Sequence, residues 1–310
     1  INKFSSSTLI SSGKLLEIKE IVSSKDIDLL VLNYPLSPSQ QKNLENYLNI
    51  KVIDRTGLII EIFGDRALTS EGKLQVELAN LTYRKSRLVR AWTHLERQRG
   101  GQSFIGGPGE LQIELDRRLI QERINSLKKD LKKIIKRRDN QRSNRKKNIN
   151  TSYALVGYTN SGKSTLFNKL TKKNEYAKDE LFATLDTKIS KLFLPSKKAT
   201  IIDTVGFISN IPTQLIDAFK ATLEEVNESD ILINVVDIND MNFRDKIRTT
   251  KKTLLSTGVS EDKVKNMITV FNKIDTFGDR KFKNTKSRVY LSALNGVGVE
   301  EFRDILSSSY

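Results

Sequence analysis

The stretch Gly157-Tyr-Thr-Asn-Ser-Gly-Lys-Ser164 decides the fold of this chain. It matches the pattern GxxxxGK(S/T) in full, follows a predicted strand and opens a predicted helix. Glycines at this spacing let backbone N–H groups turn inward around phosphate oxygens, and the amino end of the helix adds its dipole. We therefore expect Lys163 to reach the β- and γ-phosphates of a nucleotide and the Ser164 hydroxyl to ligate Mg²⁺.

Three further motifs follow the phosphate loop in order. Asp203-Thr-Val-Gly206 ends a predicted strand, which places a carboxylate near the metal and a glycine N–H near the γ-phosphate. Asn272-Lys-Ile-Asp275 also follows a strand, and an Asp there accepts two hydrogen bonds from guanine N1–H and the 2-amino group, whereas adenine would leave it unpaired. Ser292-Ala-Leu294 follows the last strand, where its backbone would touch the guanine oxygen. Together the motifs predict a GTP-binding domain.

One more Mg²⁺ ligand is expected between the phosphate loop and Asp203. Thr184 is the best candidate, because a threonine hydroxyl and its N–H can hold metal and γ-phosphate together and order the segment only in the GTP state. Thr187 is the alternative. The predicted metal ligands are Ser164, Thr184 and Asp203.

The predicted roles fall on the four motifs and on the segment around Thr184. Catalytic roles are expected for Lys163, Thr184 and Gly206. The predicted nucleotide-binding residues are Gly157, Tyr158, Thr159, Asn160, Ser161, Gly162, Lys163, Ser164, Thr165, Phe182, Ala183, Thr184, Leu185, Asp186, Asp203, Thr204, Val205, Gly206, Asn272, Lys273, Ile274, Asp275, Ser292, Ala293 and Leu294.

Phe207 stands where many GTPases have a glutamine that orients the attacking water. Phenylalanine cannot hydrogen-bond that water, so we expect slow intrinsic hydrolysis, with Lys163 and Mg²⁺ stabilising the transferring phosphoryl group. Full activity would then need a partner. The alternative is that Phe207 is simply a core residue.

Strands and helices alternate from residue 150 onward, which implies a mostly parallel sheet covered on both faces. Predicted strands lie at 153–156, 188–194, 199–203, 231–237, 267–272 and 288–291, and predicted helices at 162–170, 213–228, 243–255 and 299–306. The expected fold class is α/β, a P-loop GTPase domain preceded by a small α/β unit with a long antiparallel helical hairpin.

The upstream half contains that unit and hairpin. Around residues 15–68 we expect strands at 28–33 and 51–54, a helix capped at Ser37 and running to about residue 48, and another helix over 58–63. Two narrow apolar seams then follow coiled-coil spacing. The glycine-rich residues 99–110 separate them as a hairpin tip, or as a disordered loop without a role. The seam residues are Leu74, Leu78, Leu81, Leu88, Trp92 and Leu95, and Ile113, Ile120, Ile124, Leu127, Leu131 and Ile134. Predicted domains are 1–68, 69–149 and 150–310.

Positive charge is concentrated in one segment. The chain carries a net charge of +16, and residues 128–147 hold eleven basic and two acidic residues. Such a cluster favours folded RNA as the partner, with phosphate contacts that make binding salt-dependent. Arg97, Arg99 and Trp92 are candidates for stacking on bases, although Trp92 also fits the seam as a core residue. For His94 we expect a structural or RNA-contact role rather than catalysis.

Composition excludes several classes of site. The 310 residues include no cysteine and one histidine, which removes disulfides, thiolate nucleophiles, iron–sulfur clusters and histidine-rich metal sites. The longest near-apolar run, 231–236, is far too short to span a bilayer, and residues 1–10 have no apolar signal core. We therefore expect a cytoplasmic protein without stable membrane insertion, with peripheral association with a membrane left open.

Longer strings resemble the HflX family of GTPases. They are DELFATLDT, DTVGFISNIPTQLIDAFKATLEE, EGKLQVELANLTYRKSRLVRAWTHLERQRGG and GPGELQIELDRRLIQERI. The resemblance implies an α/β and helical-hairpin domain before the GTPase domain, association with the large ribosomal subunit, and splitting or rescue of stalled ribosomes. Three features depart from it: the N-terminal unit is short and only weakly similar before about Asp54, many relatives have proline at Thr187, and many carry a further C-terminal domain.

The expected partners are GTP or GDP, and the ribosome, whose large-subunit rRNA would contact the basic hairpin; the chain is expected to be a monomer. Two other functions remain open. One is a GTPase of the membrane surface, and the other an NTP-driven RNA remodeller that uses the same phosphate loop.

Overall fold

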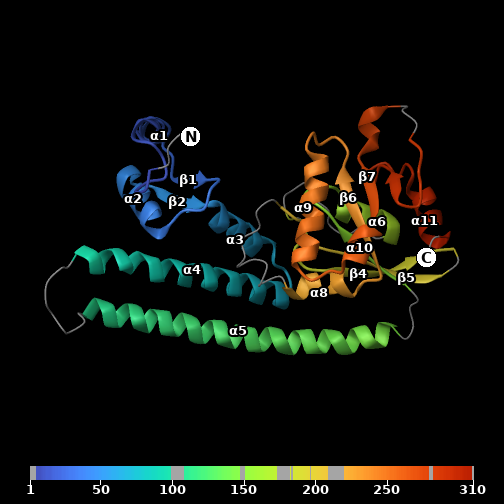
Figure 1. Ribbon diagram of the computed structural model, residues 1–310, viewed down its shortest axis with the longest axis horizontal. Helices are drawn as coiled ribbons and strands as arrows, with labels where there is room; N and C mark the ends of the chain where they lie inside the picture. The colour runs from blue at the N-terminus through green and yellow to red at the C-terminus, as the bar shows by residue number, and fades with distance from the viewer. Residues whose placement is uncertain are drawn as a thin grey trace. The chain divides into compact units, whose positions relative to one another are not determined.

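The computed structural model describes residues 5–98, 108–146, 151–172, 182, 184–195, 197–208, 220–278 and 282–308 (Figure 1). The chain forms two compact units. The first comprises residues 1–65 and 76–130, and the second comprises residues 66–75 and 131–310. Helices α4 (Ser70–Gln98) and α5 (Pro108–Lys146) each contribute residues to both units.

The first unit begins with α1 (Ser12–Lys25) and alternates strands with helices: β1 (Leu29–Leu32), α2 (Pro38–Leu48), β2 (Lys51–Asp54) and α3 (Arg55–Arg66). Strands β1 and β2 pair in parallel. The predicted cap of α2 is confirmed, because the Gln40 N–H donates to Ser37 Oγ and the Ser37 N–H donates to Gln40 Oε1.

A buried carboxylate ties this unit to α4. Asp54, at the end of β2, accepts hydrogen bonds from the N–H of Leu36 and from the N–H of Gly57. It also accepts from the Tyr83 hydroxyl at 2.7 Å and pairs with the Arg87 guanidinium at 2.6 Å. Because each of its oxygens has two donors, the charge is satisfied away from water.

Helices α4 and α5 run antiparallel and side by side, as Figure 1 shows. Within the first unit, Arg123 forms two hydrogen bonds with Glu77, at 2.7 and 3.0 Å, and Lys85 bonds to Gln121. Within the second unit, Arg138 pairs with Glu71 at 2.7 Å. The predicted tip at residues 99–107 lies outside the described residues, as do the side chains of Trp92, His94, Arg97 and Arg99.

The second unit is built on a six-stranded sheet of order β4-β5-β3-β6-β7-β8. Neighbouring strands pair in parallel except β4, which runs antiparallel to β5. The strands are β3 (Thr151–Val156), β4 (Lys188–Phe193), β5 (Lys198–Asp203), β6 (Ile231–Asp237), β7 (Ile268–Asn272) and β8 (Arg288–Tyr290), and the helices are α6 (Lys163–Thr171), α8 (Lys220–Glu228), α9 (Phe243–Ser256), α10 (Glu261–Lys265) and α11 (Val299–Ser308), with a 3₁₀ helix at Ile274–Phe277.

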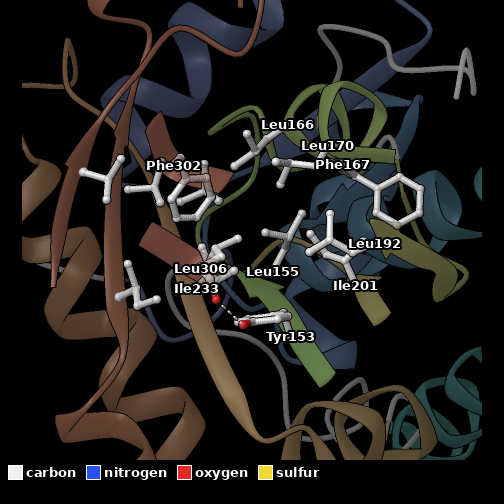
Figure 2. Close-up of a cluster of buried hydrophobic side chains, with 14 of the residues drawn as sticks. Tyr153, Leu155, Leu166, Phe167, Leu170, Leu192, Ile201, Ile233, Phe302 and Leu306 are labelled. Atoms are coloured by element: carbon white, nitrogen blue, oxygen red, sulfur yellow. Dashed lines mark hydrogen bonds between the residues drawn. The ribbon is translucent and has the colours of Figure 1, made fainter. Parts of the chain in front are cut away.

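Both faces of the sheet are covered, because residues alternate between two cores. Tyr153 and Leu155 of β3 face α6 and α11, where the Tyr153 hydroxyl donates to the carbonyl of Leu306 at 2.9 Å (Figure 2). Ala154 and Val156 face the other core, with α8, α9 and α10. The predicted fold class is confirmed, and the parallel strands present their carboxyl ends at one edge of the sheet.

Two helices differ from the sequence-based expectation. Helix α1 was not anticipated, and α3 begins at Arg55, directly after β2, rather than at residue 58. Of the helix expected over 213–228, residues 220–228 are helical and residues 213–219 lie outside the described part of the chain.

Candidate nucleotide and metal site

The phosphate loop connects the end of β3 to the start of α6. Gly162 adopts φ +88°, and a Cβ at this position would overlap the amide nitrogen of Asn272, so only glycine fits. The loop thereby directs the first turn of α6, and its unpaired N–H groups, toward the carboxyl edge of the sheet.

Lys163 is buried at the centre of this loop. Its ammonium donates to the carbonyls of Tyr158 at 2.8 Å and Gly157 at 3.2 Å. Burial lowers the pKa of Lys163 to about 8, and the charge of Asp203 acts in the opposite direction. Because desolvation disfavours the ammonium, nearby phosphate oxygens would stabilise its charged form.

Three oxygens converge beside the loop. Ser164 Oγ lies 2.6 Å from Thr184 Oγ1 and donates to Asp203 Oδ2 at 2.7 Å, and Thr184 Oγ1 donates to the same Oδ2 at 3.0 Å. The structure thus brings the three predicted metal ligands together, whereas the buried Thr187 hydroxyl has no partner within the described chain.

The donor set fits Mg²⁺. Asp203 is fully buried, and its Oδ1 has no hydrogen-bond partner among the described residues, so one carboxylate oxygen remains available to a cation. Burial raises the pKa of Asp203, and the hydrogen bond from Ser164 and the charge of Lys163 oppose that shift. Two hydroxyls and one carboxylate are hard oxygen ligands, and a site completed by phosphates and water is typical of Mg²⁺.

Asn272 connects the phosphate loop to the last predicted motif. Its Nδ2 donates to the carbonyl of Ser161 at 2.9 Å, and its Oδ1 accepts the N–H of Ala293 at 2.9 Å. Residues from three separate motifs are therefore fixed in one place, as expected from parallel strands whose carboxyl ends lie at one edge of the sheet.

Asp275 lies next to this junction, in the 3₁₀ helix that follows β7. Its carboxylate is exposed and has no hydrogen-bond partner in the described part of the chain. The preceding Lys273 has φ +68° and pairs with Asp237 at 2.8 Å, which holds the turn that presents Asp275. Leu294 is exposed, and Ser292 and Ala293 are buried.

The second motif is packed into the fold beside the phosphate loop. Thr204 is buried and donates to the carbonyl of Leu155 at 2.6 Å, and Val205 is also buried. Gly206 lies against Thr159 and Lys163. Ala183 lies outside the described residues.

Phe207 is a core residue in this structure. Its side chain is 2% exposed and packs against the core on the α8 and α9 face of the sheet. Its N–H donates to the Gly157 carbonyl at 3.0 Å, and its own carbonyl accepts the Thr159 N–H at 2.8 Å. The aromatic ring therefore anchors the segment after Gly206 and offers no hydrogen bond to water.

Sequence reasoning missed Asn234, in the middle of β6. Both polar atoms of its buried amide lack a partner among the described residues, and the side chain borders a pocket shared with Tyr158, Ser161 and Thr250. The signal was present as a single amide within the apolar run 231–236.

Comparisons with known proteins agree with this geometry. Three family profiles match: GTP-binding GTPase N-terminal over residues 1–64, GTP-binding GTPase Middle Region over 66–145, and 50S ribosome-binding GTPase over 152–273. GTPase HflX of Magnetococcus marinus is 48% identical over 298 residues, which are 94% of this chain and 68% of that protein. The chain belongs to the HflX family of GTPases. GTPase HflX of Escherichia coli is 42% identical, over 96% of this chain and 71% of that protein.

Members of the HflX family hydrolyse GTP, so this chain is a GTPase and the predicted enzyme class is confirmed. A GTP-binding protein from Sulfolobus solfataricus, solved with GDP, aligns with a TM-score of 0.51 and 27% identity, over 99% of this chain and 87% of that one. Within the described residues of this HflX-family chain, no helix combines the length and apolar character needed to cross a membrane.

Proposed function

We propose that this GTPase holds Mg²⁺ with Ser164, Thr184 and Asp203, and uses GTP hydrolysis to control its association with the large ribosomal subunit, where it splits or rescues stalled ribosomes. The convergence of the three oxygens supports the metal role. Bound there, Mg²⁺ would neutralise charge on the β- and γ-phosphates.

The chain's own groups supply binding and orientation. Lys163 would move from the loop carbonyls to the phosphate oxygens, and the N–H groups at the start of α6 would hold the same phosphates. No side chain at position 207 can orient water, so hydrolysis by the free protein is slow. Slow turnover keeps the GTP form until a partner is engaged.

The surface of α5 is the observation that carries the ribosomal part of the proposal. Ile124, Leu127 and Leu131 are buried on one side of this helix. The other side exposes a row of cations: Lys128, Lys129, Lys132, Lys133, Lys136 and Arg137. A rigid helix with one basic face suits a groove in folded RNA, and the profile matching residues 152–273 is described as that of a 50S ribosome-binding GTPase.

Purified large subunits are expected to raise the rate of GTP hydrolysis at least roughly tenfold above that of the free protein, because Phe207 leaves the free site without a water-orienting group. The measurement is steady-state phosphate release with GTP and with ATP, each with and without subunits. Fast hydrolysis by the free protein would contradict the role given to Phe207. Equal stimulation with ATP would favour an RNA remodeller of broad nucleotide use.

Neutralising four lysines of α5, by changing Lys128, Lys129, Lys132 and Lys133 to glutamine, is expected to weaken binding to large subunits. The slope of log affinity against log salt should flatten by about one for each lost phosphate contact. Nucleotide affinity should stay unchanged, since none of the four lysines belongs to the phosphate loop.

The matched control changes four exposed lysines of the GTPase domain to glutamine: Lys251 and Lys252 of α9, Lys265 of α10, and Lys286 in the segment before β8. It removes the same charge, so a general electrostatic effect would weaken both variants equally. An unchanged salt slope in the α5 variant would show that those lysines are not phosphate contacts.

A further inference from the structure

The amino end of α4 is held by a residue that lies 117 positions away in the sequence. Asp186 Oδ2 accepts the N–H of Thr69 at 2.9 Å and that of Leu68 at 3.1 Å, and Oδ1 bonds to the Thr69 hydroxyl. All three residues belong to the second unit. The carboxylate that sequence analysis assigned to the nucleotide is therefore committed to the start of a helix.

Thr69 is the cap of that helix. Its Oγ1 accepts the N–H of Gly72 at 3.0 Å, and its carbonyl accepts the N–H of Lys73 at 3.0 Å. A carboxylate beside the first turn also interacts favourably with the positive end of the helix dipole. Asp186 thus completes the cap of α4 with both charge and hydrogen bonds.

The fit at this contact leaves no room for a larger residue. A Cβ placed on Gly72 would overlap Asp186 Oδ1. Glycine is a poor helix former, and its presence in the first turn is explained by the close approach of the carboxylate. Helix α4 and the segment around Asp186 are therefore shaped to each other.

The same short segment reaches the metal site. Thr184, two residues before Asp186, bonds to Ser164 and Asp203. Leu185, the residue between them, is buried, so this three-residue segment is held by the contacts of Thr184, by the packing of Leu185 and by the contacts of Asp186. We expect a displacement of Thr184 by several ångströms to move Asp186 as well, because only one residue separates the two.

A second contact lies beside the first. Glu71, in the first turn of α4, is buried, pairs with Arg138 of α5 and accepts a hydrogen bond from Gln75. Burial raises the pKa of Glu71, Arg138 opposes the shift, and the carboxylates of Asp186, Glu225 and Glu224 raise it further. The first turn of α4, which pairs with Arg138 of α5, therefore lies within electrostatic range of α8 as well as against the Asp186 segment.

We propose that Asp186 is a positioning residue that couples the occupant of the metal and γ-phosphate site to the first turn of α4. This inference rests on the proposed role of Thr184. With GTP and Mg²⁺, Thr184 is held and Asp186 caps α4; with GDP, the segment is released and the cap is lost. By reciprocity, a partner that stabilises the first turn of α4 raises the affinity for GTP relative to GDP by the same factor.

Two variants break the contact in different ways. Asp186→Asn removes the charge and replaces one acceptor oxygen with a donor, at nearly constant volume. Gly72→Ala leaves all charges in place and favours the helix, so any loss that it causes must come from displacing Asp186 or the Thr69 hydroxyl that bonds to it. Asp230→Asn is the matched control, because Asp230 also accepts a backbone N–H and a hydroxyl, both from Ser152, at 2.7 and 2.6 Å.

Two measurements are made on each full-length variant. One is the ratio of affinities for a non-hydrolysable GTP analogue and for GDP, in Mg²⁺. The other is the rate of amide hydrogen exchange in residues 67–75 with each nucleotide bound.

In wild type, exchange of these amides should be slower with the analogue than with GDP. Asp186→Asn and Gly72→Ala should each lower the affinity ratio roughly tenfold, the size expected for hydrogen bonds to a charged group, and should make exchange independent of the nucleotide. Asp230→Asn should retain both properties.

The outcomes separate the coupling from the proposed function. Thr184→Ala should lower the affinity for the analogue and leave the affinity for GDP unchanged. If wild type and Thr184→Ala bind the analogue equally well, and also bind GDP equally well, the metal role is refuted, and the coupling with it. If Thr184→Ala behaves as expected while Asp186→Asn and Gly72→Ala keep wild-type affinity ratios and exchange, the coupling alone is refuted. A lower melting temperature without a change in either measurement would show a purely structural cap and would also refute it.

Discussion

Replacing Lys163 by alanine is expected to lower the rate of GTP hydrolysis roughly 10²- to 10³-fold, the cost of removing one preorganised donor where charge develops. The Lys163 side chain is 6% exposed, and two loop carbonyls fix its ammonium beside the start of α6. The buried side chain is therefore ordered before GTP binds, and its ammonium has only to shift from the loop carbonyls to the phosphate oxygens. Its backbone N–H groups remain in the variant, so part of the nucleotide affinity should survive.

Single-turnover phosphate release at saturating protein measures this effect apart from nucleotide affinity. Lys169→Ala is the matched control, because Lys169 lies on the same helix and is exposed to solvent. Thermal unfolding of both variants shows whether α6 remains packed. A hydrolysis rate for Lys163→Ala within a few-fold of the control would contradict a catalytic role for this ammonium.

The GTPase sheet could be predicted from the sequence because its signals are local. Each of the strands β3, β5 and β7 is a short, mostly apolar run that ends at a motif, and parallel strands place those ends at one edge of the sheet. The order of motifs therefore indicated which side chains would meet. Ser164, Thr184 and Asp203 do converge, although no spacing rule chose between Thr184 and Thr187.

Helix α1 could not be predicted, because its apolar pattern is weak. Leu15 and Val22 are buried, whereas their neighbours Leu16 and Ile21 are 55% and 46% exposed. An apolar residue on each side of the helix obscures the 3.6-residue period on which recognition of an amphipathic helix depends.

The contact between Asp186 and α4 lay beyond sequence reasoning for another reason. An aspartate two residues after a predicted metal ligand has an obvious local interpretation, and its real partners are more than a hundred positions away. Side-chain caps are usually read from neighbours three residues apart. A cap supplied from a distant segment leaves only an indirect trace, which here is the glycine at position 72 in the first turn of a helix.

Changing Asp275 to asparagine is expected to lower GTP affinity roughly 10²-fold, through the loss of two hydrogen bonds to a charged acceptor. Asp275 follows β7 on a turn held by the Lys273–Asp237 pair. The Asp275 carboxylate itself has no hydrogen-bond partner among the described residues. Asparagine has nearly the same size but presents a donor to the donors of guanine, so the loss should come from the base and not from the fold.

Xanthosine triphosphate separates this explanation from general damage to the site. Xanthine has a carbonyl oxygen where guanine has its 2-amino group, so the asparagine amide can donate to it while its oxygen still accepts the N1–H. The variant should therefore bind xanthosine triphosphate more tightly than GTP, and wild type should show the reverse order, both measured by nucleotide competition. Asp304→Asn, an exposed change on α11, should keep the wild-type order.

Because Asn272 ties the phosphate loop to Ala293 independently of position 275, phosphate binding stays intact in the Asp275→Asn variant, and a reversal of base preference can only arise at the base. Parallel losses for both nucleotides would instead place Asp275 outside the base site.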